Sequence, residues 1–202
     1  VDVGAPIEPP PDPRPSRGQV LRAWGFPPGA QVVVVYGGSQ GSLAINSAVR
    51  DWIAGGLPPR VHVIWGTGRK THEQFAALES DRVKVRAYLS PIADAYAVAD
   101  LAVARARTMT LPELFAWGIP GLLVPLPTAA ADHQTLNART LAGAGAAIHL
   151  PQASLDGARL GAEISAVLGD PARMDALRRA PAARARPDPA RAIARRVPAL
   201  LP

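Results

Sequence analysis

A glycine-rich segment, Gly37-Gly38-Ser39-Gln40-Gly41, directly follows the apolar run Val32–Tyr36. A short β-branched run predicts a buried strand, and closely spaced glycines let the backbone turn sharply and approach a ligand. Residues 42–53 then show apolar side chains at roughly helical spacing. A strand, a glycine turn and a helix in this order aim backbone N–H groups at an anion, most often a phosphate. The same pattern also fits a tight turn between strand and helix that binds nothing.

The elements that position this turn follow from the alternation of short apolar runs with longer segments of helical periodicity. We expect strands at 32–36, 61–65, 83–86, 101–104, 121–124 and 146–150. We expect helices near 42–53, 71–78, 92–99, 111–117, 132–144, 155–168 and 171–179. Repeated units of this kind predict an α/β fold, with a Rossmann-like parallel sheet and flanking helices on both faces.

The loops that follow the predicted strands should meet at one edge of the sheet. After the glycine segment they are 66–68, 87–91, 105–110 and 125–128, and the last leads into Asp132-His133-Gln134. Ligands of open parallel sheets bind beyond the carboxyl ends of the strands. The five loops could therefore line a single cleft.

Length and composition fit a globular protein with enough residues for one well-cored domain. The chain has 202 residues, of which 48% are hydrophobic and 19% charged. It has no cysteine, which excludes disulfides and thiolate metal sites. We expect no cofactor and no metal, because His133 has no second ligand at a useful spacing. His62 and His149 stand in apolar runs and are expected in the core.

The net charge of +6 is concentrated near the C-terminus, where residues 170–202 hold eight Arg and three Asp. Such a segment can bind anionic lipid or nucleic acid, but it is more often a solvated face or a linker. No aromatic residues are interleaved with these arginines, so we expect no nucleic-acid partner. We predict a Pro-rich linker at 1–16, a Rossmann-like domain at 17–180 and a basic tail at 181–202. The chain does not begin with Met, so we expect it to be part of a longer protein.

Five motifs, in order and in spacing, resemble the C-terminal domain of the MurG family. They are the glycine segment 37–41, Ala95-Tyr96-Ala97, Arg105, residues 110–114 and residues 132–138. The resemblance covers about residues 1–180. It implies one half of a GT-B glycosyltransferase, built from two Rossmann-like domains, that adds N-acetylglucosamine to the muramyl-pentapeptide lipid of peptidoglycan synthesis. The half in hand resembles the domain that binds the donor, UDP-N-acetylglucosamine.

The resemblance also implies which residues meet the nucleotide. Ser39 and the glycine-loop amides would bind the diphosphate, and the backbone of Thr108 and Met109 would approach it. Tyr88 would cover the uracil ring, and the Leu89 backbone would bind the edge of the base. The remaining loop residues assigned to nucleotide-sugar binding are Gly38, Gln40, Gly41, Arg105, Arg107 and Thr110.

The ribose and the sugar are assigned to Glu113, Gln134 and Asn137, with His133 beside them. A carboxylate accepts two hydrogen bonds from a vicinal diol, and amide groups both donate to and accept from sugar hydroxyls. Other interpretations stay open for each residue. Thr110 and Glu113 could form a helix capping box, and Gln134 and Asn137 could share a solvated helix face. Tyr88 could simply pack as part of a strand.

Three departures from the family pattern bear on function. Arg107 stands where the family usually has Gly, and Glu8 stands where an Arg near the phosphate is common. The N-terminal acceptor domain, which carries the catalytic His of the family, has no counterpart here, so we expect no catalytic residue in this chain. As part of a complete enzyme it would act on the inner face of the cytoplasmic membrane. The alternatives are the donor domain of another GT-B transferase and a non-catalytic binding module.

Overall fold

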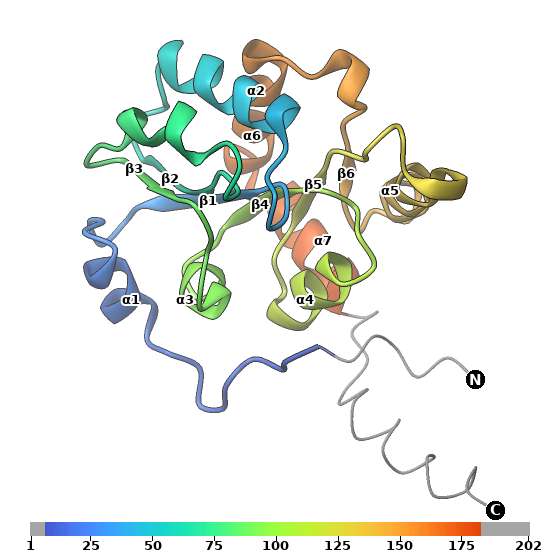
Figure 1. Ribbon diagram of the computed structural model, residues 1–202. Coiled ribbons are helices and arrows are strands. Elements are labelled where there is room, and N and C mark those ends of the chain that lie inside the picture. Colours follow the sequence, from blue (N-terminus) through green and yellow to red (C-terminus); the bar gives the residue numbers. More distant parts are fainter. Residues whose placement is uncertain (1–6, 183–202) are drawn as a thin grey trace, which may run out of the picture.

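The computed structural model describes residues 7–182 and contains one six-stranded, fully parallel sheet (Figure 1). Its strands are β1 (Gln31–Tyr36), β2 (Val61–Gly66), β3 (Val83–Arg86), β4 (Leu101–Ala104), β5 (Gly121–Leu123) and β6 (Ile148–His149). They lie in the order β3-β2-β1-β4-β5-β6. This is the strand order of dinucleotide-binding Rossmann folds, so the predicted fold class is confirmed. The order reverses between β1 and β4, and in such sheets ligands bind beyond the carboxyl ends of that strand pair.

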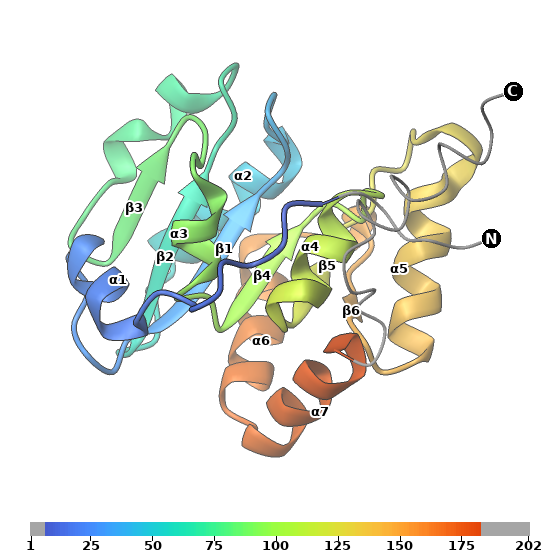
Figure 2. The ribbon, with the colours of Figure 1, turned by 90° about the horizontal axis from the view of Figure 1, so that it is seen from below.

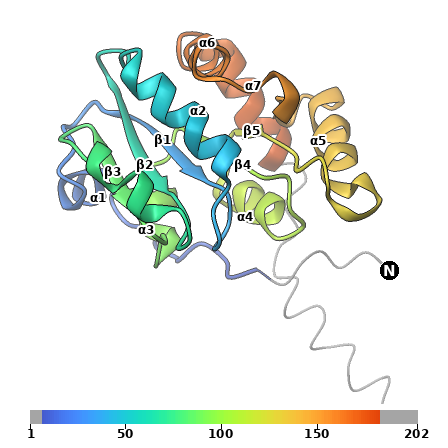
Figure 3. The ribbon, with the colours of Figure 1, turned by 45° about the horizontal axis from the view of Figure 1, so that its top comes forward.

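Helices cover both faces of the sheet. On one face α2 (Leu43–Ala54) packs against α6 (Gly157–Leu168). The other face carries α1 (Arg17–Ala23), α3 (Ile92–Tyr96) and α4 (Thr110–Trp117), which Figure 2 shows from below. Helix α5 (His133–Gly143) packs against β6 at the edge of the sheet (Figure 1). Helix α7 (Pro171–Ala182) contacts both α4 and α6, and Figure 3 shows it beside α6.

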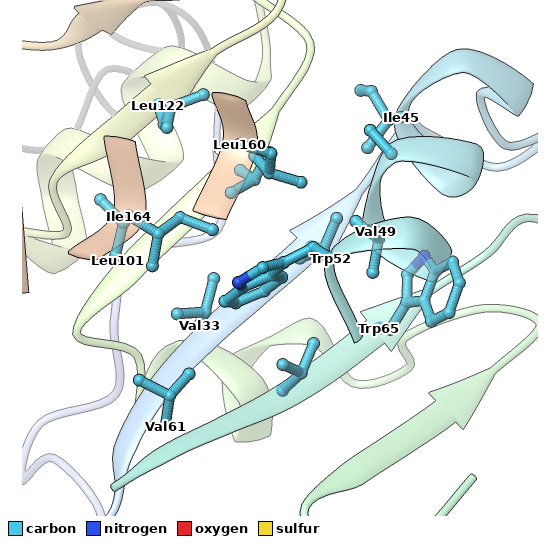
Figure 4. Packing of buried hydrophobic residues seen from close by; sticks show 14 of the residues in the cluster. Val33, Ile45, Val49, Trp52, Val61, Trp65, Leu101, Leu122, Leu160 and Ile164 are labelled. Carbon is cyan, nitrogen blue, oxygen red and sulfur yellow. The ribbon is translucent and has the colours of Figure 1, made fainter. Parts of the chain in front are cut away.

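The core lies on both sides of the central strands because β1 buries alternate valines in opposite directions. Val33 and Val35 pack beneath α2 and α6, where they meet Trp52, Leu160 and other apolar side chains (Figure 4). Val32 and Val34 face the opposite cluster, beneath α1, α3 and α4. All four valines are fully buried, as expected for the centre of a parallel sheet. The central strands are thereby held in place, and so are the loops at their carboxyl ends.

Most predicted elements are present, and the differences are local. The predicted strand at 146–150 is reduced to two residues, and the helix at 92–99 ends at Tyr96. The predicted helix at 71–78 is wrong, because this segment forms two short 3-10 helices, His72–Gln74 and Ala76–Leu78. Two further 3-10 helices span Ala130–Asp132 and Gln152–Ser154. Helix α1 was not expected.

Residues 8–15 contain no helix or strand, as expected for a Pro-rich linker, yet they are fastened to the domain. Arg14 donates hydrogen bonds to the carbonyl oxygens of Ala116 and Trp117, at 2.9 and 3.2 Å. The segment runs beneath the sheet past α4 (Figure 2). Residues 183–202, which include nearly all of the expected basic tail, lie outside the described residues, and the division at 16 and 180 stays a prediction. Within residues 7–182 no helix is both long and apolar enough to cross a membrane.

Candidate nucleotide-sugar site

A cleft of about 990 Å³ opens among the loops that follow β1, β3, β4 and β5. The predicted site residues that line it are Gly38, Ser39, Tyr88, Leu89, Arg107, Thr108, Met109, Thr110, Glu113, His133 and Gln134. Gln40, Gly41, Arg105 and Asn137 do not line it. The loops after β1 and β4 lie side by side, because Tyr36 and Ala104 are paired at the ends of these strands. The cleft therefore occupies the position at which the strand order reverses.

The glycine loop contributes unpaired backbone donors and packs closely on the next loop. The N–H groups of Ser39 and Gln40 donate to no residue between 7 and 182. Gly41 allows this loop to pack against the loop after β2. Its φ is +86°, and an added Cβ would lie 2.2 Å from the Thr67 carbonyl oxygen. An added Cβ on Gly68 would lie 2.0 Å from the Gly41 nitrogen, so neither glycine tolerates a side chain. Close loop packing thus holds Ser39 in place.

The start of α4 presents a second group of backbone donors. Thr108, Met109 and Thr110 line the cleft, and their N–H groups find no acceptor in the described part of the chain. Free N–H groups at a helix N-terminus, together with the helix dipole, favour an anion. The two groups of donors, one after β1 and one after β4, come from neighbouring strands. They form a surface suited to a diphosphate.

Glu113 lies on α4, half-buried, and its carboxylate is held by tyrosines. The Tyr96 hydroxyl donates to Glu113 Oε2 at 3.0 Å, and the Tyr36 hydroxyl lies 2.8 Å from that of Tyr96. Burial raises the pKa of Glu113, and the Tyr96 hydrogen bond partly offsets this. The capping-box interpretation is wrong, because Thr110 is the first helical residue and its side chain makes no capping bond. Both tyrosines line the cleft, although neither is among the binding residues expected from the sequence.

Tyr88 follows β3 and keeps 51% of its surface exposed, so the interpretation of a packed strand residue is wrong. The guanidinium carbon of Arg69 lies 5.2 Å from the centre of its ring. Leu89 beside it is buried and lines the same cleft. An exposed ring at the wall of a cleft offers an apolar face on which a base can stack.

Gln134, near the start of α5, lines the cleft, whereas Asn137 on the same helix does not. Gln134 is 5% exposed, and its Oε1 accepts the Leu126 N–H at 3.1 Å. Its amide NH₂ group has no hydrogen-bond partner among residues 7–182. Gln134 is therefore not a solvated residue. Asn137 is half-buried and donates from Nδ2 to the Ala106 carbonyl oxygen at 3.3 Å. His133 lines the cleft, with Nδ1 2.8 Å from the Ala130 carbonyl oxygen.

The other histidines lie away from the cleft. His62 is buried and packs on the Phe26 ring, with 4.8 Å between ring centres, as expected for a core residue. His149 is half-buried, and burial lowers its pKa. Its Nε2 has no hydrogen-bond partner among the described residues. Across the described residues, no three His, Asp or Glu side chains gather in a way that would hold a metal ion.

Residues 32–193 match the model of the glycosyltransferase family 28 C-terminal domain. The chain belongs to this family. A relative from Salinibacter ruber is 43% identical over 181 residues, which cover 88% of this chain and 49% of the relative. A relative from Chlorobium limicola is 34% identical over 90% of this chain and 50% of the relative. Both are named as UDP-N-acetylglucosamine–N-acetylmuramyl-(pentapeptide) pyrophosphoryl-undecaprenol N-acetylglucosamine transferases.

Among solved structures, MurG of Acinetobacter baumannii superposes with a TM-score of 0.72 at 24% identity, over 89% of this chain and 52% of that protein. This likeness shows a shared fold. The chain spans about half the length of the curated relatives it matches. The resemblance that the five motifs suggested is thus confirmed at the level of the family.

Arg105, a family motif residue, has a structural role and does not face the ligand cleft. Its guanidinium donates to the carbonyl oxygens of Val124 and Pro125, to Ser42 Oγ and to Gln152 Oε1, at 2.6–3.1 Å. Burial lowers its pKa to about 10, and the nearby charge of Arg107 adds to the effect. Ser42 is the N-cap of α2, so Arg105 fastens this helix to the loop after β5. The expected ligand contact of Arg105 is therefore corrected.

Arg107, which departs from the family pattern, fits its loop without left-handed backbone. Its guanidinium lies against the glycine loop, because an added Cβ on Gly38 would be 2.2 Å from Arg107 Nη1. No described residue hydrogen-bonds to this guanidinium or forms an ion pair with it. Glu8, the second departure, is exposed and lines the same cleft. The cleft thus holds one added cation and one added anion relative to the family pattern.

Proposed function

We propose that this chain is the donor-binding half of a glycosyltransferase. The complete enzyme transfers N-acetylglucosamine from UDP-N-acetylglucosamine to undecaprenyl-pyrophosphoryl-muramyl-pentapeptide. The printed names of the relatives support this assignment. One observation carries it: a single cleft combines unpaired backbone N–H groups, a half-buried carboxylate and an exposed aromatic ring. These groups match the diphosphate, the ribose diol and the base of a nucleotide sugar.

Each part of the donor has a partner in this proposal. The N–H groups around Ser39 and at the start of α4 bind the diphosphate, with Arg107 adding charge. Tyr88 stacks on the uracil, and Glu113 accepts the ribose hydroxyls. Gln134 donates its amide NH₂ group, which has no partner in the described part of the chain, to the amino sugar. Asn137 orients this wall of the cleft through its bond to the Ala106 carbonyl oxygen.

The chemistry that follows is an inverting displacement. The 4-hydroxyl of the muramyl sugar attacks C1 of N-acetylglucosamine, its proton passes to a base, and the C1–O bond to the diphosphate breaks. Negative charge grows on the departing UDP, and preorganised N–H donors stabilise such charge most effectively. The acceptor and the base belong to the other half of the enzyme in this proposal. The complete enzyme then works at the inner face of the cell membrane, where its lipid-linked acceptor lies, with no nucleic-acid partner.

Isothermal titration calorimetry of this chain with UDP-N-acetylglucosamine, UDP-glucose and UDP tests the proposal. We expect binding of all three ligands, with the amino sugar bound more tightly than glucose. Gln134→Ala should lower the affinity for UDP-N-acetylglucosamine and leave the affinity for UDP unchanged. Equal loss for both ligands would contradict the sugar-specific role of Gln134. Preference for a different nucleotide sugar would favour another GT-B transferase, and no binding of any nucleotide would favour a non-catalytic module.

A further inference from the structure

Three side chains from three different elements form a hydrogen-bonded chain along the wall of the cleft. Tyr36 ends β1, Tyr96 ends α3 and Glu113 lies on α4. The Tyr96 hydroxyl donates to Glu113 Oε2 at 3.0 Å, and the Tyr36 and Tyr96 hydroxyl oxygens lie 2.8 Å apart. A phenol has a single proton to donate. With Tyr96 donating to an ionised Glu113, Tyr36 must therefore donate to Tyr96.

The tyrosines are fixed more firmly than a surface pair would be. Tyr36 and Tyr96 are 9% and 3% exposed, and their ring centres lie 6.2 Å apart. Tyr96 also packs against Trp117, at 5.9 Å between ring centres. Burial raises the pKa of both phenols, which keeps their protons in place as donors. One oxygen of the Glu113 carboxylate is thus held by a donor that cannot swing away.

We propose that Tyr96, supported by Tyr36, is a positioning residue that presets the Glu113 carboxylate for the ribose diol. This inference rests on the proposed function. With Oε2 held by Tyr96, the carboxylate presents its other oxygen to the cleft at little further entropic cost. A ligand without the 2′-hydroxyl would leave a half-buried carboxylate oxygen without its donor. The tyrosine pair thereby makes the cleft selective for ribonucleotides over deoxyribonucleotides.

The test compares UDP with 2′-deoxy-UDP by calorimetry on the full chain. The parent should bind UDP about tenfold more tightly than the deoxy ligand, as expected for one charged hydrogen bond. Tyr96→Phe removes only the hydroxyl. It should lower the affinity for UDP by roughly three- to tenfold and have little effect on the affinity for 2′-deoxy-UDP. The ratio of the two affinities then falls toward one. Tyr36→Phe should lower the ratio in the same direction by a smaller factor.

Trp65→Phe is the matched control. It removes another buried aromatic donor, Trp65 Nε1, which bonds to Asn46 Oδ1 at 2.9 Å within the core on the opposite face of the sheet. It should lower the melting temperature and leave the affinity ratio unchanged. If Tyr96 had only a structural role, Tyr96→Phe would likewise lower the melting temperature and leave the affinity ratio unchanged.

An unchanged ratio in Tyr96→Phe, or equal weakening of both ligands, would overturn the inference while the proposed function stands. If Tyr96→Phe does not fold, an unchanged ratio in Tyr36→Phe has the same meaning. A parent chain that binds neither nucleotide overturns the proposed function and this inference together.

Discussion

Glu113 combines a half-buried position with a charge that its proposed role requires. Burial raises its pKa, and the hydrogen bond from Tyr96 pulls it part of the way back. Only the ionised carboxylate accepts from both ribose hydroxyls, because protonation turns one oxygen into a donor. The nucleotide sugar should therefore bind strongly at a pH above the raised pKa that Glu113 has in the unliganded protein. Its binding should weaken as the pH falls through that pKa.

The first prediction concerns this pH dependence. Affinity for UDP-N-acetylglucosamine should decline as the pH is lowered from neutral, and the decline should begin at a higher pH than an ordinary glutamate would require, because burial raises the pKa of Glu113. Glu113→Gln should weaken binding by about 1–3 kcal/mol at neutral pH and flatten this decline. Calorimetry of both proteins across the range measures the effect. The same decline in parent and variant would remove Glu113 from the site.

The second prediction concerns Arg107. Its guanidinium lies against Gly38 in the cleft and pairs with none of residues 7–182. Arg107→Ala should weaken UDP by about 1 kcal/mol and reduce the dependence of its affinity on salt, because a partly exposed charge on a phosphate is screened. Uridine, which has no phosphate, should bind both proteins equally. Tighter UDP binding by the variant would mean that Arg107 blocks the cleft.

The sequence identified several polar side chains of the cleft, but it did not reveal the residues to which they hydrogen-bond. The family motif at 110–114 assigned Glu113, and Gln134 stands after the loop that follows a predicted strand; both line the cleft. Arg105 has the same kind of position, but its side chain turns to buried carbonyl groups, which depends on tertiary packing that spacing does not encode. The bond between Tyr36 and Tyr96 joins residues 60 positions apart, so no local pattern announces it.

Among the elements, the loops after β1 and β2 support each other through two glycines. Gly68 has a φ of +86°, and an added Cβ would lie 2.0 Å from the backbone of Gly41. Gly118, at the end of α4, has a φ of +69° with nothing within 4 Å of an added Cβ. Gly68 and Gly118 thus both have left-handed backbone, but an added Cβ would clash only at Gly68.

The third prediction uses this pair. Gly118→Ala should cost about 1 kcal/mol of unfolding free energy, from backbone strain alone. Gly68→Ala should cost about 3 kcal/mol or more and weaken UDP binding, because the Ser39 loop must shift. Urea unfolding followed by circular dichroism gives both values. Equal costs for the two variants would mean that the loops separate freely and do not position Ser39.

Elements with strong local patterns were predictable, and those held by distant contacts were not. The β-branched runs of β1 and β2 define these strands within one residue. At 71–78 the Thr71 hydroxyl bonds back to the Thr67 carbonyl oxygen and accepts from Asn46, which competes with a regular helix. Helix α1 has only seven residues, and Arg17 secures it through bonds to Val98, Ala30 and Asp100.

At the scale of the whole molecule, the chain has the fold and the motifs of the family 28 C-terminal domain and about half the length of its relatives. Inverting transfer needs the acceptor hydroxyl opposite the departing diphosphate. The N–H groups proposed to bind the diphosphate lie at the point where the strand order reverses. The surface opposite them belongs, in the proposed function, to the other half. Binding and transfer should therefore separate experimentally.

The fourth prediction is that this chain binds UDP-N-acetylglucosamine but releases no UDP when the lipid-linked acceptor is added. A fusion of the unmatched half of the Salinibacter ruber relative to this chain should restore UDP release, because it supplies an acceptor surface and a base. The same fusion carrying Glu113→Gln should release UDP more slowly at a donor concentration below saturation. A coupled assay for UDP measures all three proteins. Acceptor-dependent release by the chain alone would mean that its own cleft holds the acceptor and the base, and that the proposed division of labour is wrong.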